Sequence, residues 1–154
     1  MASDPRPTKT IATNRRARHE FELGDTFEAG LVLTGSEVKA LRQGNATIQE
    51  SFIDIRRGNA DWVNGYIAPY EHGGYANHEP RRRRRLLLHA KEIEKLRKGA
   101  QQQGFTIVPL RLYFSGGRAK LALALGRGKK LHDKRQSIAE RDAKRRIDRA
   151  KSER

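Results

Sequence analysis

The sequence predicts a mainly β domain of the barrel or sandwich kind, with a few short helices and a basic C-terminal tail. Short apolar stretches alternate like half-buried strands through the middle of the chain, and Gly, Asn and Pro separate them. All five Phe, the four Tyr and the single Trp lie between Phe21 and Phe114. The core must therefore form there, and a chain of 154 residues suffices for one core of modest size.

The first half of the chain is predicted to hold three strands and one helix. Residues 1–13, with two prolines, are predicted to be a mobile arm. Ser36 can cap the start of a short helix, and Gly44 can end it. Residues 70–80, which contain Gly73 and Gly74, are predicted to be a loop. The three strands are expected at residues 26–33, 51–56 and 61–67.

The second half is predicted to contain a helix and then a hairpin. Residues 86–100 carry apolar side chains at roughly helical spacing. Residues 106–114 and 119–125 flank residues 115–118, whose length and Gly content are typical of a β-hairpin turn. Pro109 lacks a backbone N–H, so it predicts an edge position or a bulge in the first strand of this hairpin.

The net charge of +15 is unevenly distributed along the chain. Residues 1–19 carry +4, residues 20–80 carry −6, residues 81–125 carry +10 and residues 126–154 carry +7. Concentrated charge that repels itself indicates a polyanionic partner, and nucleic acid is the leading candidate. An anionic membrane surface is the alternative, but no segment joins a strong apolar face to a basic one. No membrane partner is expected.

Composition and motifs give no support for an enzyme. The absence of Cys excludes a disulfide scaffold and a thiolate zinc site. The five His are scattered, without metal-ligand spacing, and residues 126–130 lack the Gly and Ser/Thr of a nucleotide-binding loop. We therefore expect no catalytic residue, metal or cofactor. With no apolar leader and no stretch near the ~20 apolar residues of a membrane span, a cytoplasmic location is expected.

Two basic clusters are candidate contacts to RNA phosphates. The five arginines Arg81–Arg85 would fan out around the backbone, so some should meet phosphate and others should only be solvated. Arg84 and Arg85 are taken as RNA-binding. The second cluster surrounds His132, whose ring can stack on an exposed base while its neighbours hold the backbone.

Residues 128–154 are predicted to form a separate basic tail. They contain no Pro or aromatic residue, and their few apolar residues form no stripe. Ser137 and Glu140 form a potential capping box, and i,i+4 ion pairs follow, each contributing only ~0.2–0.5 kcal/mol. Such weak cues predict a tail that becomes helical only on a partner.

Five stretches of the sequence form a recognisable ordered set: N-R-R-A-R-H-E-F (14–21), F-E-A-G-L-V-L-T-G-S-E-V-K-A-L-R (27–42), R-R-L-L-L-H (84–89), V-P-L-R-L-Y-F (108–114) and G-K-K-L-H-D-K-R (128–135). In this order they resemble the motifs of the SmpB family, whose members bind transfer-messenger RNA. The resemblance extends from about residue 11 to 146. It implies a closed antiparallel β-barrel of the OB-fold kind over residues 14–127, with a tail that is disordered when free and helical when bound.

The resemblance also implies a function and its partners. The body would bind the tRNA-like domain of transfer-messenger RNA and deliver that RNA to stalled ribosomes for trans-translation. The tail would enter the decoding centre of the small subunit and the empty mRNA path. Alanyl-tRNA synthetase and elongation factor Tu would be met only indirectly, through the RNA.

Site residues are carried over from the family by position. The RNA-contacting set corresponds to Asn14, Glu28, Leu87 and Lys120. The ribosome-contacting set lies in the tail and corresponds to Gly128, Lys129, Lys130, His132, Asp133, Lys134 and Arg135. Many family members have Trp where this chain has Ala143, so any stacking role at that position is absent or moved. From the residues alone, core packing is an equally good interpretation of Leu87.

Two other functions compete with this one. A ribosomal or ribosome-assembly protein would bind rRNA and ignore transfer-messenger RNA. An RNA-modifying enzyme would need a nucleophile, metal ligands or a cofactor loop, and none is visible in the sequence.

Overall fold

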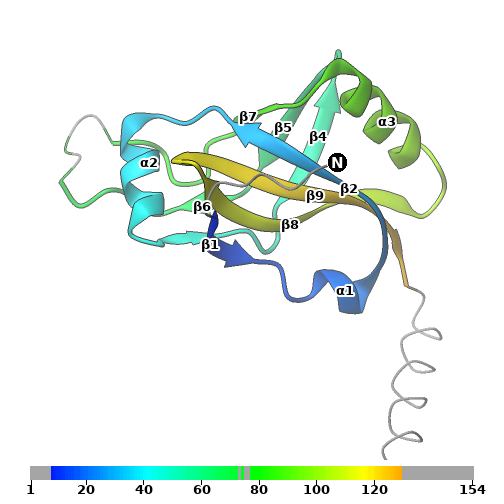
Figure 1. Cartoon of the computed structure of the whole chain (residues 1–154), viewed down its shortest axis with the longest axis horizontal. Helices are drawn as coiled ribbons and strands as arrows, with labels where there is room; N and C mark the ends of the chain where they lie inside the picture. Colours follow the sequence, from blue (N-terminus) through cyan, green and yellow to red (C-terminus); the bar gives the residue numbers. More distant parts are fainter. Residues whose placement is uncertain (1–7, 73, 75–76, 130–154) are drawn as a thin grey trace, which may run out of the picture.

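The computed structural model describes residues 8–72, 74 and 77–129, and the fold is mainly β with short helices (Figure 1). The strands are β1 (Thr8–Thr13), β2 (Phe21–Leu31), β3 (Ala46–Thr47), β4 (Phe52–Arg56), β5 (Asn59–Val63), β6 (Tyr66–Ile67), β7 (Arg84–Leu87), β8 (Phe105–Ser115) and β9 (Arg118–Gly128). The helices are α1 (Ala17–Glu20), α2 (Gly35–Arg42) and α3 (Ala90–Ala100).

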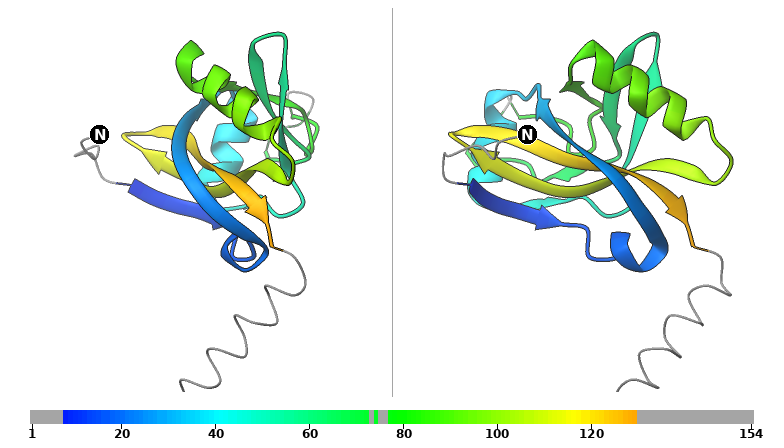
Figure 2. Two further views of the ribbon diagram at one scale, coloured as in Figure 1. Left: turned by 90° about the vertical axis from the view of Figure 1, so that its right-hand side faces the viewer. Right: turned by 45° about the vertical axis from the view of Figure 1, so that its right-hand side comes forward.

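Seven of these strands form one antiparallel sheet in the order β1-β8-β9-β2-β7-β5-β4, and β3 pairs with β6. The prediction of a closed barrel is wrong. Within the described ranges, β1 and β4 end the sheet and no backbone pairing joins them. β1 pairs with the edge of β8 from Arg111 to Ser115. β4 also contacts β8, but this part of the β8 edge is already paired. The long strands β2, β8 and β9 nevertheless curve around the core (Figure 2).

The predicted N-terminal arm is corrected over residues 8–13. These residues form β1, which runs antiparallel to β8 from the pair Thr8↔Ser115 to Thr13↔Arg111. Three Thr and one Ile favour an extended conformation, and Ile11 packs partly buried against the core. The rest of the predicted arm lies outside the described residues.

The predicted helix over residues 86–100 begins later, at Ala90. Leu86 is buried and Leu87 exposed, an alternation that places both in β7. His89 and Glu92 form a capping box that starts α3. Pairing of β7 with β2 and β5 therefore overrides the helical spacing of these leucines.

The predicted hairpin is confirmed as β8 and β9. Its turn has positive φ at both central residues, 57° at Gly116 and 78° at Gly117, a geometry that favours Gly. The predicted disruption at Pro109 is also confirmed, because the β8–β9 register shifts between Pro109 and Arg111.

One face of the large sheet covers the core, together with α2 and α3. From this sheet face Ala29, Leu112, Leu121 and Leu123 are fully buried. Trp62 of β5, Leu41 of α2 and Leu96 of α3 complete the same cluster. α3 packs against β8 and β9, whereas α1 lies where β2 begins, next to β8 (Figure 1). Most of the other face of β1, β8, β9 and β2 is not covered by a helix, and α1 lies at one end of it.

Candidate nucleic-acid-binding surface

The side of the sheet that points away from the core carries a row of polar side chains, which we call the outer face. Directly opposed residues of antiparallel strands project to the same side. The register Leu87↔Gly30, Gly30↔Lys120, Lys120↔Tyr113 and Tyr113↔Thr10 therefore runs one row across five strands. Glu28, Ala122 and Arg111 form the next row. The outer face thus consists of Thr10, Glu28, Leu87, Arg111, Tyr113 and Lys120.

Glu28 and Lys120 form the central pair of the outer face. Lys120 Nζ lies 3.3 Å from Glu28 Oε1, and the Glu28 side chain is 44% exposed. Tyr113 is paired with Lys120 across β8 and β9 and is almost fully buried. Burial and then a hydrogen bond from its phenol to Glu28 raise the pKa of Tyr113 to about 12. The phenol therefore remains protonated at neutral pH and donates to the Glu28 carboxylate.

Arg111 adds a second cation to this surface. Its guanidinium carbon lies 4.2 Å from the centroid of the Tyr113 ring, within the range of a cation–π contact. Arg111 Nη1 also donates to Thr10 Oγ1 over 3.3 Å. These contacts connect β1 to β8 through side chains and keep Arg111 next to the Glu28 pair.

A groove of about 840 Å³ borders Glu28 and Lys120. Leu87 and Arg85 also line it. Leu87 is 59% exposed, which excludes the interpretation that it is a core residue. Its Cβ is only 3.3 Å from where a Cβ on Gly30 would be, so a Gly at position 30 allows Leu87 to lie close over β2. Three of the four residues carried over for RNA contact therefore share one groove.

Asn14 lies in a neighbouring groove of about 800 Å³ instead. Its Nδ2 donates to the Pro109 carbonyl oxygen over 3.0 Å. Arg111 and Ala122 line this second groove as well, and they belong to the same row as Glu28. Asn14 is thus adjacent to the outer face, and its amide already has an intramolecular role. The further cations along this groove are Arg15, Arg18 and Lys129.

The prediction that Arg84 contacts RNA is wrong, because its side chain is fully buried. Its guanidinium pairs with the equally buried Glu37 of α2 and donates to the carbonyl oxygens of Gly65 (2.7 Å) and Pro80 (2.9 Å). It also lies 5.3 Å from the centroid of the Trp62 ring. Arg84 therefore connects α2, β5 and the segment before β7.

Glu37 receives several hydrogen bonds at this site. Burial alone would raise the pKa of Glu37, but hydrogen bonds from Arg82, from the Thr34 backbone N–H and from Arg84 outweigh it and lower the pKa to about 2. The Arg82 contact is 2.6 Å and the Thr34 contact 2.9 Å. Burial also lowers the pKa of Arg84, and the carboxylate of Glu37 opposes that effect. The pair remains ionised at neutral pH.

The other arginines of Arg81–Arg85 also have partners within the chain. Arg81 donates to the Asn64 carbonyl oxygen over 3.1 Å, and Arg82 pairs with Glu37. Arg83 contacts Asp54 and Asp61, and Arg85 contacts Asp61 at 2.7 Å. Of these, only Arg85 lines the groove beside Glu28. The arginine run thus neutralises acids of the preceding segment, whereas the sequence analysis expected some of these arginines to meet phosphate and the others only to be solvated.

Two residues of the predicted tail set lie in the described part of the chain. Gly128 ends β9 opposite Phe21. The Lys129 backbone N–H donates to the Glu20 carbonyl oxygen over 2.8 Å, and its Nζ to the Arg18 carbonyl oxygen over 3.1 Å. The body therefore extends to Lys129. Lys130, His132, Asp133, Lys134 and Arg135 lie outside the described residues.

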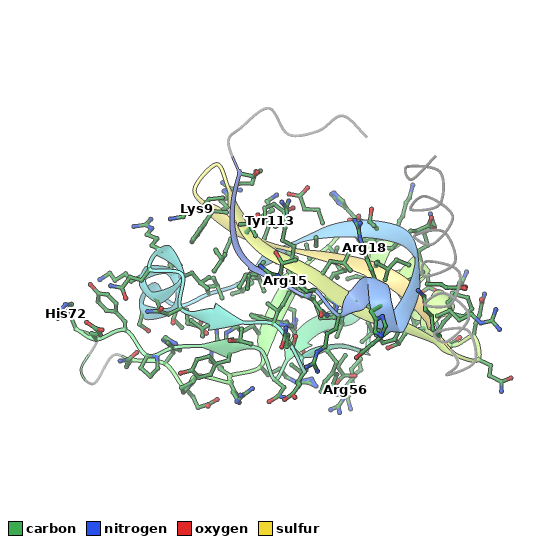
Figure 3. The ribbon with its side chains drawn as sticks, turned by 90° about the horizontal axis from the view of Figure 1, so that it is seen from below. Lys9, Arg15, Arg18, Arg56, His72 and Tyr113 are labelled. Carbon is green, nitrogen blue, oxygen red and sulfur yellow. The ribbon has the colours of Figure 1, made fainter. Side chains whose placement is uncertain are left out.

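The sequence interpretation missed Tyr113 and Arg111. Both belong to the predicted strand over residues 106–114, two positions apart, and Leu112 between them points into the core. Strand alternation alone could therefore have placed them on the side opposite Leu112. In Figure 3 Tyr113 lies with Lys9 by β1, whereas His72 lies at the far end of the molecule.

Among residues 8–72, 74 and 77–129, no three His, Cys, Asp or Glu side chains gather in a way that could hold a metal ion. No helix in the same ranges is long and apolar enough to span a membrane.

An open polar sheet face, bordered by two cation-lined grooves on a chain of net charge +15, is typical of an RNA-binding protein. Comparison with known proteins identifies the family within this class. The family model for SmpB protein matches residues 11–153. The chain therefore belongs to the SmpB family.

Individual relatives agree with this assignment. The SsrA-binding protein of Pelotomaculum thermopropionicum is 51% identical over 146 residues, 95% of each chain. The SsrA-binding protein of Thermobifida fusca is 54% identical over 142 residues, 92% of this chain and 89% of the relative. A solved structure described as "tmRNA-SmpB: a journey to the center of the bacterial ribosome" matches with a TM-score of 0.67 and 47% identity, covering 82% of this chain and 92% of that one.

Proposed function

We propose that this protein binds transfer-messenger RNA through its outer face and delivers it to stalled ribosomes for trans-translation. Membership of the SmpB family supports this function. The observation that carries the proposed site is that Glu28, Leu87 and Lys120, which are distant in sequence, line one groove. Arg85 lines the same groove, and Asn14 lines the neighbouring one. Each type of contact is available there: an acceptor, an apolar surface and cations.

The same proposal covers the tail and the partners. Residues from Gly128 to Arg135 would contact the small subunit at the empty decoding site, with the tail as a helix in the mRNA path. Alanyl-tRNA synthetase and elongation factor Tu would meet the protein only through the bound RNA. The curved sheet is consistent with the OB-fold kind of RNA-binding domain. Action on ribosomes would place the protein in the cytoplasm.

A competition experiment tests the proposal against the rRNA-binding alternative. Labelled transfer-messenger RNA is bound at 150 mM salt and then displaced by unlabelled transfer-messenger RNA or by rRNA fragments of equal length. We expect displacement at far lower concentrations of transfer-messenger RNA. Equal displacement by rRNA fragments would favour a ribosomal or assembly protein instead.

Replacing Glu28 with Ala is expected to weaken binding of transfer-messenger RNA, although it makes the protein more positive. Loss of a charged acceptor costs roughly 1–3 kcal/mol, whereas bulk attraction predicts tighter binding. Fluorescence anisotropy measures the change. Asp25→Ala is the matched control, because Asp25 lies on the same strand, is 69% exposed and removes the same charge. Equal affinities for both variants would contradict a specific role for Glu28.

The salt dependence of binding is expected to distinguish the arginines of Arg81–Arg85 that contact phosphate from those that do not. Removing a cation that contacts a phosphate reduces the slope of log affinity against log salt concentration by about one. Arg83 is paired with Asp54 and Asp61, so Arg83→Ala should leave the slope unchanged. Arg85→Ala should reduce it, because Arg85 is half exposed beside the groove. Equal slopes for Arg85→Ala and the wild type would show that Arg85 does not contact a phosphate.

A further inference from the structure

We propose that the outer face recognises an unpaired guanine: Glu28 accepts from the N1–H and N2 amine of the base, Lys120 donates to O6, and Tyr113 positions the Glu28 carboxylate. This inference rests on the proposed binding of transfer-messenger RNA and names the base that the groove takes. Bases in unpaired RNA present their Watson–Crick edges to protein side chains, whereas paired bases do not.

The order of donors and acceptors on the outer face selects guanine. A carboxylate offers two acceptor oxygens side by side, and an ammonium offers only donors. Lys120 Nζ lies 3.3 Å from Glu28 Oε1, so the protein presents a donor directly beside the paired acceptors. The Watson–Crick edge of guanine has the complementary order, with the O6 acceptor followed by the donors N1–H and N2–H. Adenine, cytosine and uracil have no two adjacent donors on that edge.

The groove has room for a base on this pair. The whole groove, which also extends along Val38 of α2 and Ile93 of α3, has a volume of about 840 Å³, larger than a single nucleobase, and Glu28 and Lys120 both line it. Leu87 borders the same groove with 59% of its surface exposed, so it can pack on one face of an inserted ring. Gly30 lies between Leu87 and Lys120 in the row across the sheet and adds no side chain of its own, and the Leu87 side chain lies close over it.

Tyr113 is suited to position the carboxylate because its own location is fixed. It lies opposite Lys120 in the β8–β9 ladder and is only 5% exposed. The interaction of its phenol with Glu28 contributes to the raised pKa of Tyr113, and the Arg111 guanidinium carbon lies 4.2 Å from the centroid of its ring. The phenol does not need to touch RNA. It reduces the freedom of Glu28, so that a two-bond contact with a base costs less entropy.

Inosine substitution tests the base assignment. Inosine keeps O6 and N1–H but lacks the N2 amine of guanine. Transfer-messenger RNAs with each unpaired guanine of the tRNA-like domain replaced singly by inosine are bound to the wild type and to Glu28→Gln. We expect one position where inosine weakens wild-type binding about tenfold and Glu28→Gln binding less than twofold.

The proposal is overturned if the wild type binds transfer-messenger RNA selectively but no inosine position couples to Glu28. That result differs from failure of the proposed function, in which the wild type would show no preference for transfer-messenger RNA over rRNA fragments. The two failures are therefore distinguishable in one set of titrations.

Tyr113→Phe tests the positioning role, since it removes only the phenol oxygen. We expect about 2–10-fold weaker binding of transfer-messenger RNA with an unchanged salt slope, and less than twofold further loss in the Glu28→Gln background. Tyr66→Phe is the control, because Tyr66 lies on β6 against Arg81 and away from the outer face. Additive losses for Tyr113→Phe and Glu28→Gln would show that Tyr113 does not act through Glu28.

Discussion

Removing residues 130–154 is expected to abolish tagging of peptides on stalled ribosomes while the protein still binds transfer-messenger RNA. The deleted segment carries ten Lys and Arg against five Asp and Glu, a net charge of +5. Truncation after Lys129 retains its contacts with Glu20 and Arg18, so the described body should stay folded. Affinity for transfer-messenger RNA should fall only modestly, through the loss of nonspecific attraction. In vitro tagging and anisotropy measure the two activities separately.

Substitutions of His132 distinguish two explanations for the expected loss of tagging. An imidazole can stack on a base exposed in the decoding centre, and Phe can also stack there but cannot carry charge. His132→Ala should slow tagging more than His132→Phe, with no change in RNA affinity. If His132→Ala tags at the wild-type rate, the tail acts through its charge and helix alone. If the truncated protein itself tags normally, the proposed role of the whole tail is wrong.

Glu37→Gln is expected to cause the largest loss of stability among single substitutions of charged residues. It removes the charge that compensates Arg84, whose side chain is fully buried, and weakens the contact to Arg82. Leaving a buried cation without its partner costs about 3–5 kcal/mol. Urea unfolding, followed by Trp62 fluorescence, measures the free energy of unfolding. The matched control is Asp54→Asn, which breaks partly exposed pairs to Arg56 and Arg83 and should cost about 1 kcal/mol or less.

The buried pair of Glu37 and Arg84 predicts that the stability of the protein depends on pH. The pKa of Glu37 is lowered to about 2 in the folded state, so its contribution to stability is present above the ordinary pKa of 4.5. That contribution is lost as the pH falls from about 4.5 toward 2. The stability of Glu37→Gln should therefore vary less over this range than that of the wild type. Parallel pH profiles would contradict an ionised Glu37 in the folded protein.

Local patterns explain which elements the sequence could predict. The hairpin of β8 and β9 follows from Gly116 and Gly117 between alternating strands, and the bulge follows from the missing donor of Pro109. The family resemblance selected Glu28, Leu87 and Lys120, and these three line one groove. Their contacts with RNA remain predictions.

Non-local partners explain what could not be predicted. Arg84 is buried because Glu37, 47 residues earlier, reaches it from α2. No short stretch of sequence contains both residues, so the sequence could not show that Arg84 is a buried member of the arginine run. β1 forms because β8, about 100 residues later, offers it an edge, and that same pairing leaves the sheet open. Burial and pairing of this kind depend on the complete fold rather than on local periodicity.

The most direct test of the central claim is to recover the RNA that this protein binds in cells. The tagged full-length protein and its Glu28→Ala variant are expressed at equal levels, captured from lysate at 150 mM salt, and the co-purified RNA is sequenced. We expect transfer-messenger RNA to be the most enriched species with the wild type and to lose most of its enrichment with the variant. Enrichment of rRNA fragments without transfer-messenger RNA, or equal enrichment for both proteins, would contradict the account.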